Sequence, residues 1–227
     1  MSGRVVTLGA HVLDILGRYV THIPDGQGSV LLDEIRLAPA GSAAGTAVGL
    51  AKLGLEVATV GAVGEDSLGD MLIRALNGFG VDTSHVVRKV GVQTSASILP
   101  IRPNGDRPAL HAIGANAAYS IDDVPWPLIE NASHLHLGGN DSMRGLGREG
   151  AAQILQRARD GGATTSMDIL SEGSPKLLSI LKPCLPLVDW FMPNADQACK
   201  LTESREPEDA ALRLLDLGVR GVVLTMG

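Results

Sequence analysis

The sequence predicts an α/β protein built on a doubly wound, mostly parallel sheet with helices on both faces and a small β-sheet lid. Two observations predict the sheet: short apolar runs typical of buried strands recur along the chain, and helical segments separate them. A third observation predicts the lid, since two strand pairs interrupt this alternation. We therefore expect a lid of residues 12–37 and 94–113 on a core of residues 1–11, 38–93 and 114–227.

The expected elements follow one another in a regular order outside the lid. Helix boundaries rest on N-caps, such as Ser120, and on glycines that close several of the helices. The lid pairs surround turn-rich segments, PDGQG in the first and PNGD in the second. Predicted strands cover 4–10, 12–22, 29–37, 56–64, 93–101, 107–113, 133–139, 163–170, 187–194 and 221–227, and predicted helices cover 41–53, 67–80, 120–132, 147–162, 195–202 and 206–218.

Composition narrows the class of protein. With 227 residues, 44% of them hydrophobic and 19% charged, the chain is long and apolar enough to bury a core. The net charge of -6 argues against nucleic acid or an anionic membrane as the main partner. The longest uncharged stretch, 37–51, is too short and too rich in Gly and Ala to cross a bilayer. We expect a cytoplasmic protein in which Cys184 and Cys199 are reduced thiols.

The last segment, GVVLTMG at 221–227, is apolar and β-branched, which predicts a strand buried on both faces. A helix at 206–218 leads into it. Because ligands of open α/β sheets bind outside the carboxyl ends of the strands, a binding site is expected where this strand ends.

The glycine-rich segment 38–54 is the most informative part of the chain. Gly41, Gly45 and Gly49 lie four residues apart, so one face of the predicted helix carries almost no side chain. Close packing of the helix on the sheet explains this pattern, and so does a helix N-terminus that a small ligand approaches closely. Neither the phosphate-binding loop G-x-x-x-x-G-K-[ST] nor the dinucleotide fingerprint G-x-G-x-x-G after a strand occurs, which argues against those two enzyme classes.

Seven segments, in this order, resemble the ribokinase-like family of carbohydrate kinases, also called the phosphofructokinase-B family. The resemblance covers essentially the whole chain, and its most specific part is the block AGSAAGTAVGLAKLGLEVATVGAVGEDSLG. The other segments are GAHVLDILG, GVDTSHV, QTSASILPIRPNGDR, GANAA, PNADQACKLT and GVVLTMG.

The resemblance implies an enzyme that phosphorylates a sugar hydroxymethyl group, with ATP and Mg²⁺ as cofactors. It also implies that the lid covers the substrate and can form a homodimer contact. Two alternatives remain open: a nucleoside kinase, for which the lid offers little stacking beyond Tyr19, and a non-catalytic sugar- or nucleotide-binding protein on the same fold.

For the sugar, the resemblance implies that Asp14 holds substrate hydroxyl groups. The other interpretation is that Asp14 is an acidic residue that caps a helix or stabilises a turn. Gly41 and Ser42 are expected beside the sugar. Gly45 stands where the family usually has asparagine, and Gly138 stands where some members carry a polar substrate-binding residue.

For the nucleotide, PNADQ corresponds to the family's N-x-x-E element, which organises Mg²⁺ and the ATP phosphates. Asn194 matches this element, and an ordinary helix cap is its alternative role. Gln197 replaces the glutamate, so it is expected to act on the metal only indirectly, through a coordinated water. Thr225 and Gly227 match the T-x-G turn that meets the nucleotide.

A few other polar residues are candidates for the site. Asp168 closes a predicted strand at its carboxyl end, where a site role is expected. His134 and His136 project from one strand face but have no third ligand nearby in the sequence, which argues against a metal site. Arg107 is either a solvated lid charge or a contact for an anionic group of the substrate.

The resemblance also implies two features that are expected beyond Gly227: a glycine-rich turn that forms an anion hole, and an aspartate that accepts the hydroxyl proton. The chain as written is therefore expected to be catalytically incompetent, and no catalytic residue is assigned within it.

Overall fold

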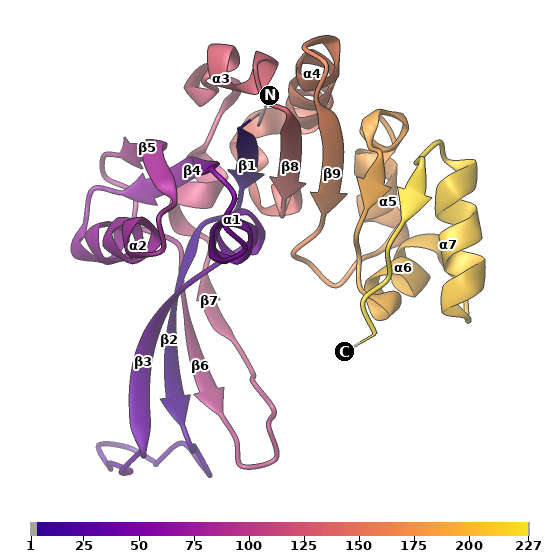
Figure 1. The fold of residues 1–227 in the computed structure, drawn as a ribbon. Helices are drawn as coiled ribbons and strands as arrows, with labels where there is room; N and C mark the ends of the chain where they lie inside the picture. The colour runs from indigo at the N-terminus through magenta and orange to yellow at the C-terminus, as the bar shows by residue number, and fades with distance from the viewer. Residues whose placement is uncertain (1–3, 227) are drawn as a thin grey trace.

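The structure is a computed structural model that describes residues 4–226. Its main sheet has seven strands in the order β11-β10-β9-β8-β1-β4-β5, and every neighbouring pair is parallel (Figure 1). The order steps outward from β1 in both directions, which confirms the predicted doubly wound sheet. The strands are β1 (Val5–Gly9), β4 (Val57–Gly64), β5 (Asp82–Lys89), β8 (His134–Gly138), β9 (Thr164–Asp168), β10 (Trp190–Phe191) and β11 (Gly221–Val222).

Helices cover the sheet from two sides and form two separate apolar clusters. On β4, Val57 and Val63 join a cluster with α1 and α2, whereas Val60 and Ala62 point the other way into the larger cluster with α3 to α7. The alternation of side chains along a strand explains this division, and it buries all eight residues of β4. The helices are α1 (Ser42–Lys52), α2 (Ser67–Gly78), α3 (Trp126–Glu130), α4 (Gly147–Asp160), α5 (Pro175–Leu181), α6 (Ala195–Thr202) and α7 (Pro207–Asp216).

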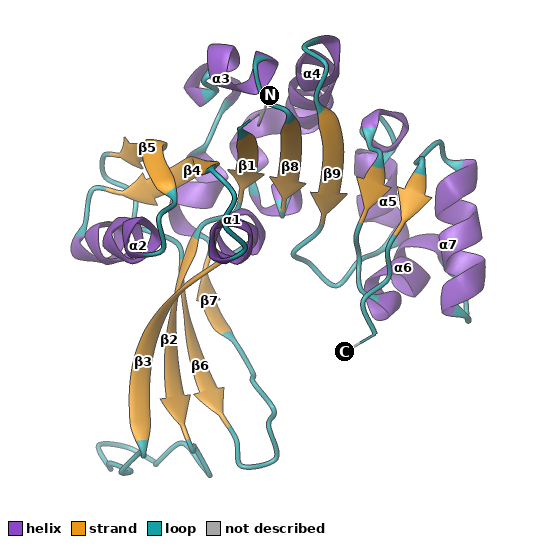
Figure 2. Ribbon diagram, viewed as in Figure 1, coloured by secondary structure: helices purple, strands orange, loops and turns teal. Residues whose placement is uncertain are grey.

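The lid is a second sheet that extends away from the core (Figure 2). Its strand order β3-β2-β6-β7 confirms that the two interrupting pairs join into one small sheet, in which β2 and β6 run parallel. Asn116 ties the lid to the core, because its side chain accepts from the backbone N–H of His11 and donates to the carbonyl of His11, both at 3.0 Å. The lid strands are β2 (Val12–Arg18), β3 (Glu34–Ala40), β6 (Ala96–Ile101) and β7 (Leu110–Ala112).

Two lid boundaries differ from the predicted ones. The first strand ends at Arg18 rather than at residue 22, and β3 runs to Ala40, so residues 38–40 belong to the lid sheet rather than to the core. Hydrogen bonding sets both limits, since Arg18 pairs with Glu34 and Val12 pairs with Ala40.

The final strand is much shorter and more exposed than predicted. Only Gly221–Val222 form β11, both residues are half-buried, and Val223 is 39% exposed. Within residues 4–226, β11 pairs with β10 alone, so it is an edge strand and the prediction of burial on both faces was wrong.

The predicted helix at 120–132 is broken in two. A 3-10 turn, η2 (Ile121–Asp123), is capped as expected by Ser120, whose backbone N–H donates to Asp123 at 2.8 Å. Pro125 and Pro127 lack the N–H groups that would continue the helix, so α3 starts only at Trp126. Across residues 4–226, no helix is long and apolar enough to cross a membrane.

Glycines set how closely the backbones approach at the carboxyl ends of β1 and β8. A Cβ atom on Gly138 would lie 2.6 Å from the backbone nitrogen of Ala43, and one on Gly41 would lie 2.4 Å from the carbonyl oxygen of Ala10. Gly41 also has a φ of 87°, which favours glycine. The predicted close packing therefore holds at Gly41. It is wrong for Gly45 and Gly49, which face open space while the alanines of α1 are buried.

This difference predicts opposite effects of adding one methyl group. Gly138→Ala should lower the free energy of unfolding by about 1–3 kcal/mol, because Ala43 backbone must move. Gly49→Ala should raise it by about 1 kcal/mol, because a helical glycine in open space gains a better helix former. Urea unfolding followed by circular dichroism measures both values. Equal stability of the two variants would contradict the packing described.

Candidate functional site

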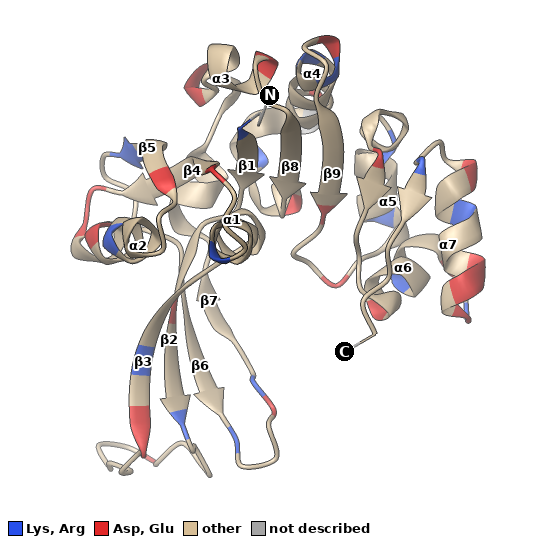
Figure 3. Ribbon diagram, viewed as in Figure 1, with Lys and Arg blue, Asp and Glu red and all other residues tan. Residues whose placement is uncertain are grey.

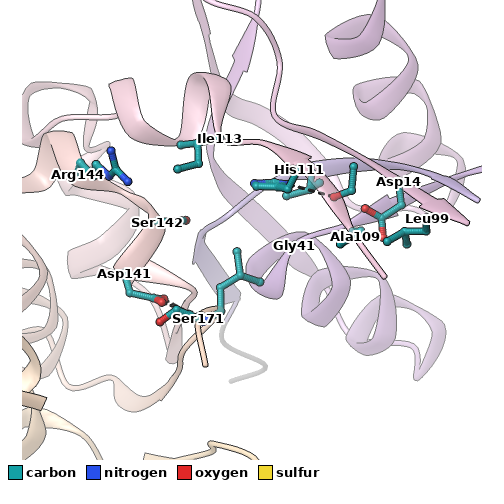
Figure 4. A pocket seen from close by; sticks show the side chains of 14 residues that line it. Asp14, Gly41, Leu99, Ala109, His111, Ile113, Asp141, Ser142, Arg144 and Ser171 are labelled. Atoms are coloured by element: carbon teal, nitrogen blue, oxygen red, sulfur yellow. Dashed lines mark hydrogen bonds between the residues drawn. The ribbon is translucent and has the colours of Figure 1, made fainter. Parts of the chain in front are cut away.

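A cavity beside the lid has a volume of about 530 Å³, within the usual range for small-molecule sites. It lies between the lid strands and the loops that follow β8 and β9, at the carboxyl ends of the parallel strands (Figure 4). The residues that line it are Val12, Asp14, Ala40, Gly41, Ser97, Leu99, Ala109, His111, Ile113, Asp141, Ser142, Arg144, Leu170 and Ser171.

Asp14 supplies the lid side of the cavity with a carboxylate. In the lid sheet it pairs with Ser97, which in turn pairs with His111, so the three side chains share one face. The Ser97 hydroxyl lies 3.0 Å from Nδ1 of His111. Burial raises the pKa of Asp14, and the Ser97 hydroxyl, His111 and Arg107 oppose that rise. These groups form a compact set of donors and acceptors for hydroxyl groups.

The loop after β8 supplies the opposite wall. Asp141 accepts from the backbone N–H groups of Leu170 (2.9 Å) and Ser171 (2.8 Å), so it fixes the loop after β9 against the loop after β8. Ser142 donates to the carbonyl of Gly139 at 2.7 Å. Arg144 is the fixed positive charge among the residues that line the cavity.

Asp168 lies at the carboxyl end of β9, and it is the single Asp, Glu, Lys or Arg within strands β1, β4, β8 and β9 (Figure 3). It accepts from the backbone N–H of Gly139 at 2.8 Å and from the Ser42 side chain. Burial raises the pKa of Asp168 to about 6, a rise that the two hydrogen bonds oppose and Asp141 reinforces. Nε2 of His136 is 3.8 Å away, but burial lowers the pKa of this histidine to about 4, so it is neutral at pH 7.

Asn194 and Gln197 form a capping box at the start of α6. The Asn194 side chain accepts from the Gln197 N–H at 2.7 Å, and Oε1 of Gln197 accepts from the Asn194 N–H at 2.9 Å. Nε2 of Gln197 donates to the carbonyls of Ser171 (2.8 Å) and Ile169 (3.3 Å). Both ends of the Gln197 amide are therefore bound by backbone groups.

Thr225 lies beside this cap. It forms an isolated parallel bridge with Asn194, and its carbonyl accepts from the N–H of Ala195 at 3.0 Å. Gly227, its predicted companion, lies outside the described residues. A cavity of about 230 Å³ adjoins the cap and is lined by Leu170, Ser171, Glu172, Asn194, Asp196, Gln197 and Lys200.

The two cavities share Leu170 and Ser171, so the loop after β9 is a common wall between them. The structure thus brings Asp14 and Gly41 together in the larger cavity and Asn194 and Gln197 together in the smaller one. Ser42, Gly45 and Gly138 do not line either of these cavities, and they lie at or near the start of α1 and the end of β8.

Sequence reasoning missed six polar residues that line the larger cavity: Ser97, His111, Asp141, Ser142, Arg144 and Ser171. A usable signal existed for Asp141, Ser142 and Arg144, since the polar run NDSMR directly follows a predicted buried strand at the edge where ligands bind. His111 had no such signal, because its position depends on which lid strands pair.

Residues 3–227 match the pfkB family of carbohydrate kinases, and the chain belongs to this family. It is 32% identical to an ATP-dependent ribose-1-phosphate kinase of Halopiger xanaduensis over 165 residues. This matched region covers 73% of this chain and 53% of that protein. It is 26% identical to a 2-dehydro-3-deoxygluconokinase of Bacillus subtilis, over 83% of this chain and 61% of that protein. The chain thus spans little more than half the length of these relatives.

Solved structures show the same fold. The ribokinase of Arabidopsis thaliana, complexed with ribose and ATP, superimposes over all of this chain and 73% of its own, with a TM-score of 0.81 at 23% identity. A putative ribokinase II from E. coli, solved in an apo form, gives a TM-score of 0.83 at 23% identity over 99% of this chain and 73% of its own. The predicted α/β core with a β lid is therefore confirmed.

The raised pKa of Asp168 predicts a pH-dependent effect of Asp168→Asn. Because the folded protein holds this proton more tightly than the unfolded chain, the stability that Asp168 contributes falls as the pH rises from 3.8 to about 6. The variant should thus gain stability over the parent across this range, by up to roughly 3 kcal/mol at pH 7. Urea unfolding between pH 4 and pH 7 measures the difference. Asp33→Asn, at an exposed lid position, is the control. A stability difference between Asp168→Asn and the parent that is the same at pH 4 and at pH 7 would contradict the assignment.

Proposed function

We propose that the protein carrying this chain transfers a phosphoryl group from ATP to a hydroxymethyl group of a small sugar. The observation that carries this proposal is the pair of cavities that share one wall at the carboxyl ends of the strands. Transfer between two bound reactants requires adjoining sites, and phosphoryl transfer depends mainly on positioning and charge stabilisation. Membership of a carbohydrate kinase family supports the proposed reaction.

The larger cavity is proposed as the sugar site. Asp14 would accept hydrogen bonds from sugar hydroxyls, and Ser97 and His111 would complete the polar side of the site. Gly41 leaves room at the start of α1 for the sugar to approach backbone N–H groups. Gly45 contributes no side chain, in contrast to the asparagine that the family resemblance implies at this position.

The smaller cavity is proposed to face the ATP phosphates. Asn194 and Thr225 are adjacent in the structure, and Lys200 brings a positive charge that Asp196 (3.2 Å) and Glu172 (3.3 Å) partly neutralise. Among the residues described, no group of three or more metal-binding side chains occurs. This arrangement fits Mg²⁺, which usually keeps its waters and is held by one or two carboxylates together with the phosphates. When bound, Mg²⁺ would neutralise phosphate charge.

No described residue is proposed as the base that accepts the hydroxyl proton. Asp168 is proposed to position the acceptor site, since it holds the N–H of Gly139 and contacts the Ser42 side chain. The family resemblance implies an anion hole and a catalytic aspartate, and neither is assigned among residues 4–226.

A non-catalytic binding protein is the second candidate function. The engagement of the Gln197 amide by three backbone groups favours it, because this side chain is less free to order a metal-bound water. A nucleoside acceptor is less favoured, because Tyr19 does not line the sugar cavity.

We also propose that a second copy of the chain covers the outer face of the lid. Register places Ile15, Leu37, Ile98 and Leu110 side by side on the face opposite Asp14. Ile98 is 53% exposed and Leu110 is 64% exposed. Exposed apolar patches of this kind mark protein contacts, and the lid contact that the family resemblance implies is with another copy.

Replacing Asp14 tests the sugar site. Asp14→Asn should weaken sugar binding by about tenfold or more, because a charge-assisted hydrogen bond is lost. Calorimetric titration with ribose and fructose, together with ADP release in the presence of ATP and Mg²⁺, measures the effect. Asp25→Asn, in the exposed lid loop, serves as the control. Binding without ADP release would favour the second candidate function, and unchanged binding would remove Asp14 from the site.

Replacing Ile98 tests the lid contact. Ile98→Lys should convert a dimer to a monomer, because a charge would be buried in the apolar contact. Size-exclusion chromatography with light scattering measures the mass. Leu212→Lys, at a position on α7 that is 61% exposed, should leave the dimer intact. A parent protein that is monomeric at micromolar concentration would refute the proposal.

A further inference from the structure

Arg144 and Asp14 lie at opposite ends of the larger cavity (Figure 4). Asp14 comes from lid strand β2, whereas Arg144 comes from η4 (Arg144–Leu146), in the loop between β8 and α4. The cavity therefore has a carboxylate at its lid end and, at its core end, the Arg144 guanidinium on the same wall as the Asp141 carboxylate. A neutral sugar needs hydroxyl-binding groups, but it does not need the guanidinium.

The backbone of Arg144 is held in place by close packing. The neighbouring Gly145 lies so near η1 (Gly114–Ala118) that a Cβ atom on it would be 2.4 Å from the carbonyl oxygen of Tyr119 and 3.0 Å from that of Ala117. Tyr119 is itself fully buried. Packing of Gly145 thus fixes the backbone at Arg144 against the segment that follows the lid. The fold therefore determines where the Arg144 side chain begins.

The guanidinium of Arg144 is free of acidic partners. Among the described residues it makes no ion pair and no hydrogen bond, although eight other arginines pair with Asp or Glu side chains or bond a carbonyl. Asp141, the acid nearest to it along the chain in the same cavity wall, is occupied by the N–H groups of Leu170 and Ser171. An unpaired, exposed guanidinium at the edge of a binding cavity is available to an anionic ligand.

We infer that Arg144 binds an anionic substituent, a carboxylate or a phosphate ester, of the sugar acceptor. The inference rests on the proposed sugar site, whose acceptor class it narrows. Arg144 also lines a neighbouring cavity of about 250 Å³, together with Asn140 and Asp141, so there is room beyond the sugar for such a group. The planar fork of an arginine fits both anions through two parallel hydrogen bonds. The substituent is placed at the end of the acceptor that is remote from the hydroxyls held by Asp14.

The experiment compares anionic sugars with neutral ones. Calorimetric titration of the full-length protein uses ribose against ribose 1-phosphate for the phosphate, and fructose against 2-dehydro-3-deoxygluconate for the carboxylate. At least one anionic sugar should bind about tenfold or more tightly than its neutral partner. Arg144→Gln should abolish that preference, and Arg144→Lys should keep part of it, because a lysine keeps the charge but not the fork.

Arg205→Gln is the matched control, since it removes the same charge from an exposed loop between α6 and α7 and should leave the preference intact. The inference is overturned if neutral sugars bind as tightly as anionic ones, or if Arg144→Gln keeps the full preference. Preferential binding of an anionic sugar without phosphoryl transfer would support the inference while contradicting the proposed kinase function. Absence of binding for all four sugars would overturn both.

Discussion

The close approach of three backbone segments at the carboxyl ends of β1 and β8 is the constraint on which the site depends. A Cβ atom on Gly9 would lie 1.8 Å from the carbonyl oxygen of Gly138, and Gly138 in turn lies against the start of α1 at Ala43. Because these glycines carry no side chains, the helix start, the lid connection and the loop after β8 meet at one point. Asp168 then bonds to that loop through Gly139, which brings β9 into the same arrangement.

Carboxylates around this point have different tasks because their partners differ. Asp141 is satisfied by two backbone N–H groups and holds two loops together, whereas Asp168 is buried, and this burial raises its pKa to about 6 although Gly139 and Ser42 donate to it. Asp14 remains beside hydroxyl and imidazole groups on the open face of the lid. Only Asp14 faces the cavity with a carboxylate that is not already committed to the backbone, and this leaves it to bind a ligand.

The sequence allowed the alternating sheet and the lid to be predicted, since both rest on local pattern and on order along the chain. Features that depend on contacts distant in the sequence could not be predicted. The exposure of Gly45 depends on which face of α1 meets the sheet, and the short β11 depends on its having one neighbour. Arg144 joins the cavity because Gly145 packs on η1, a contact that no local pattern reveals.

Gln197 stands where the family resemblance implies a glutamate, and its contacts explain why an amide suits this position. Its Nε2 donates to the carbonyls of Ile169 and Ser171, so it holds the loop that separates the two cavities. A glutamate at this position would direct a carboxylate at two carbonyl oxygens, which repel it, and the loop would have to move. The amide and this loop conformation therefore belong together. The negative charge that the resemblance implies at this position is absent, and the carboxylates that line the smaller cavity are those of Asp196 and Glu172, both bound to Lys200.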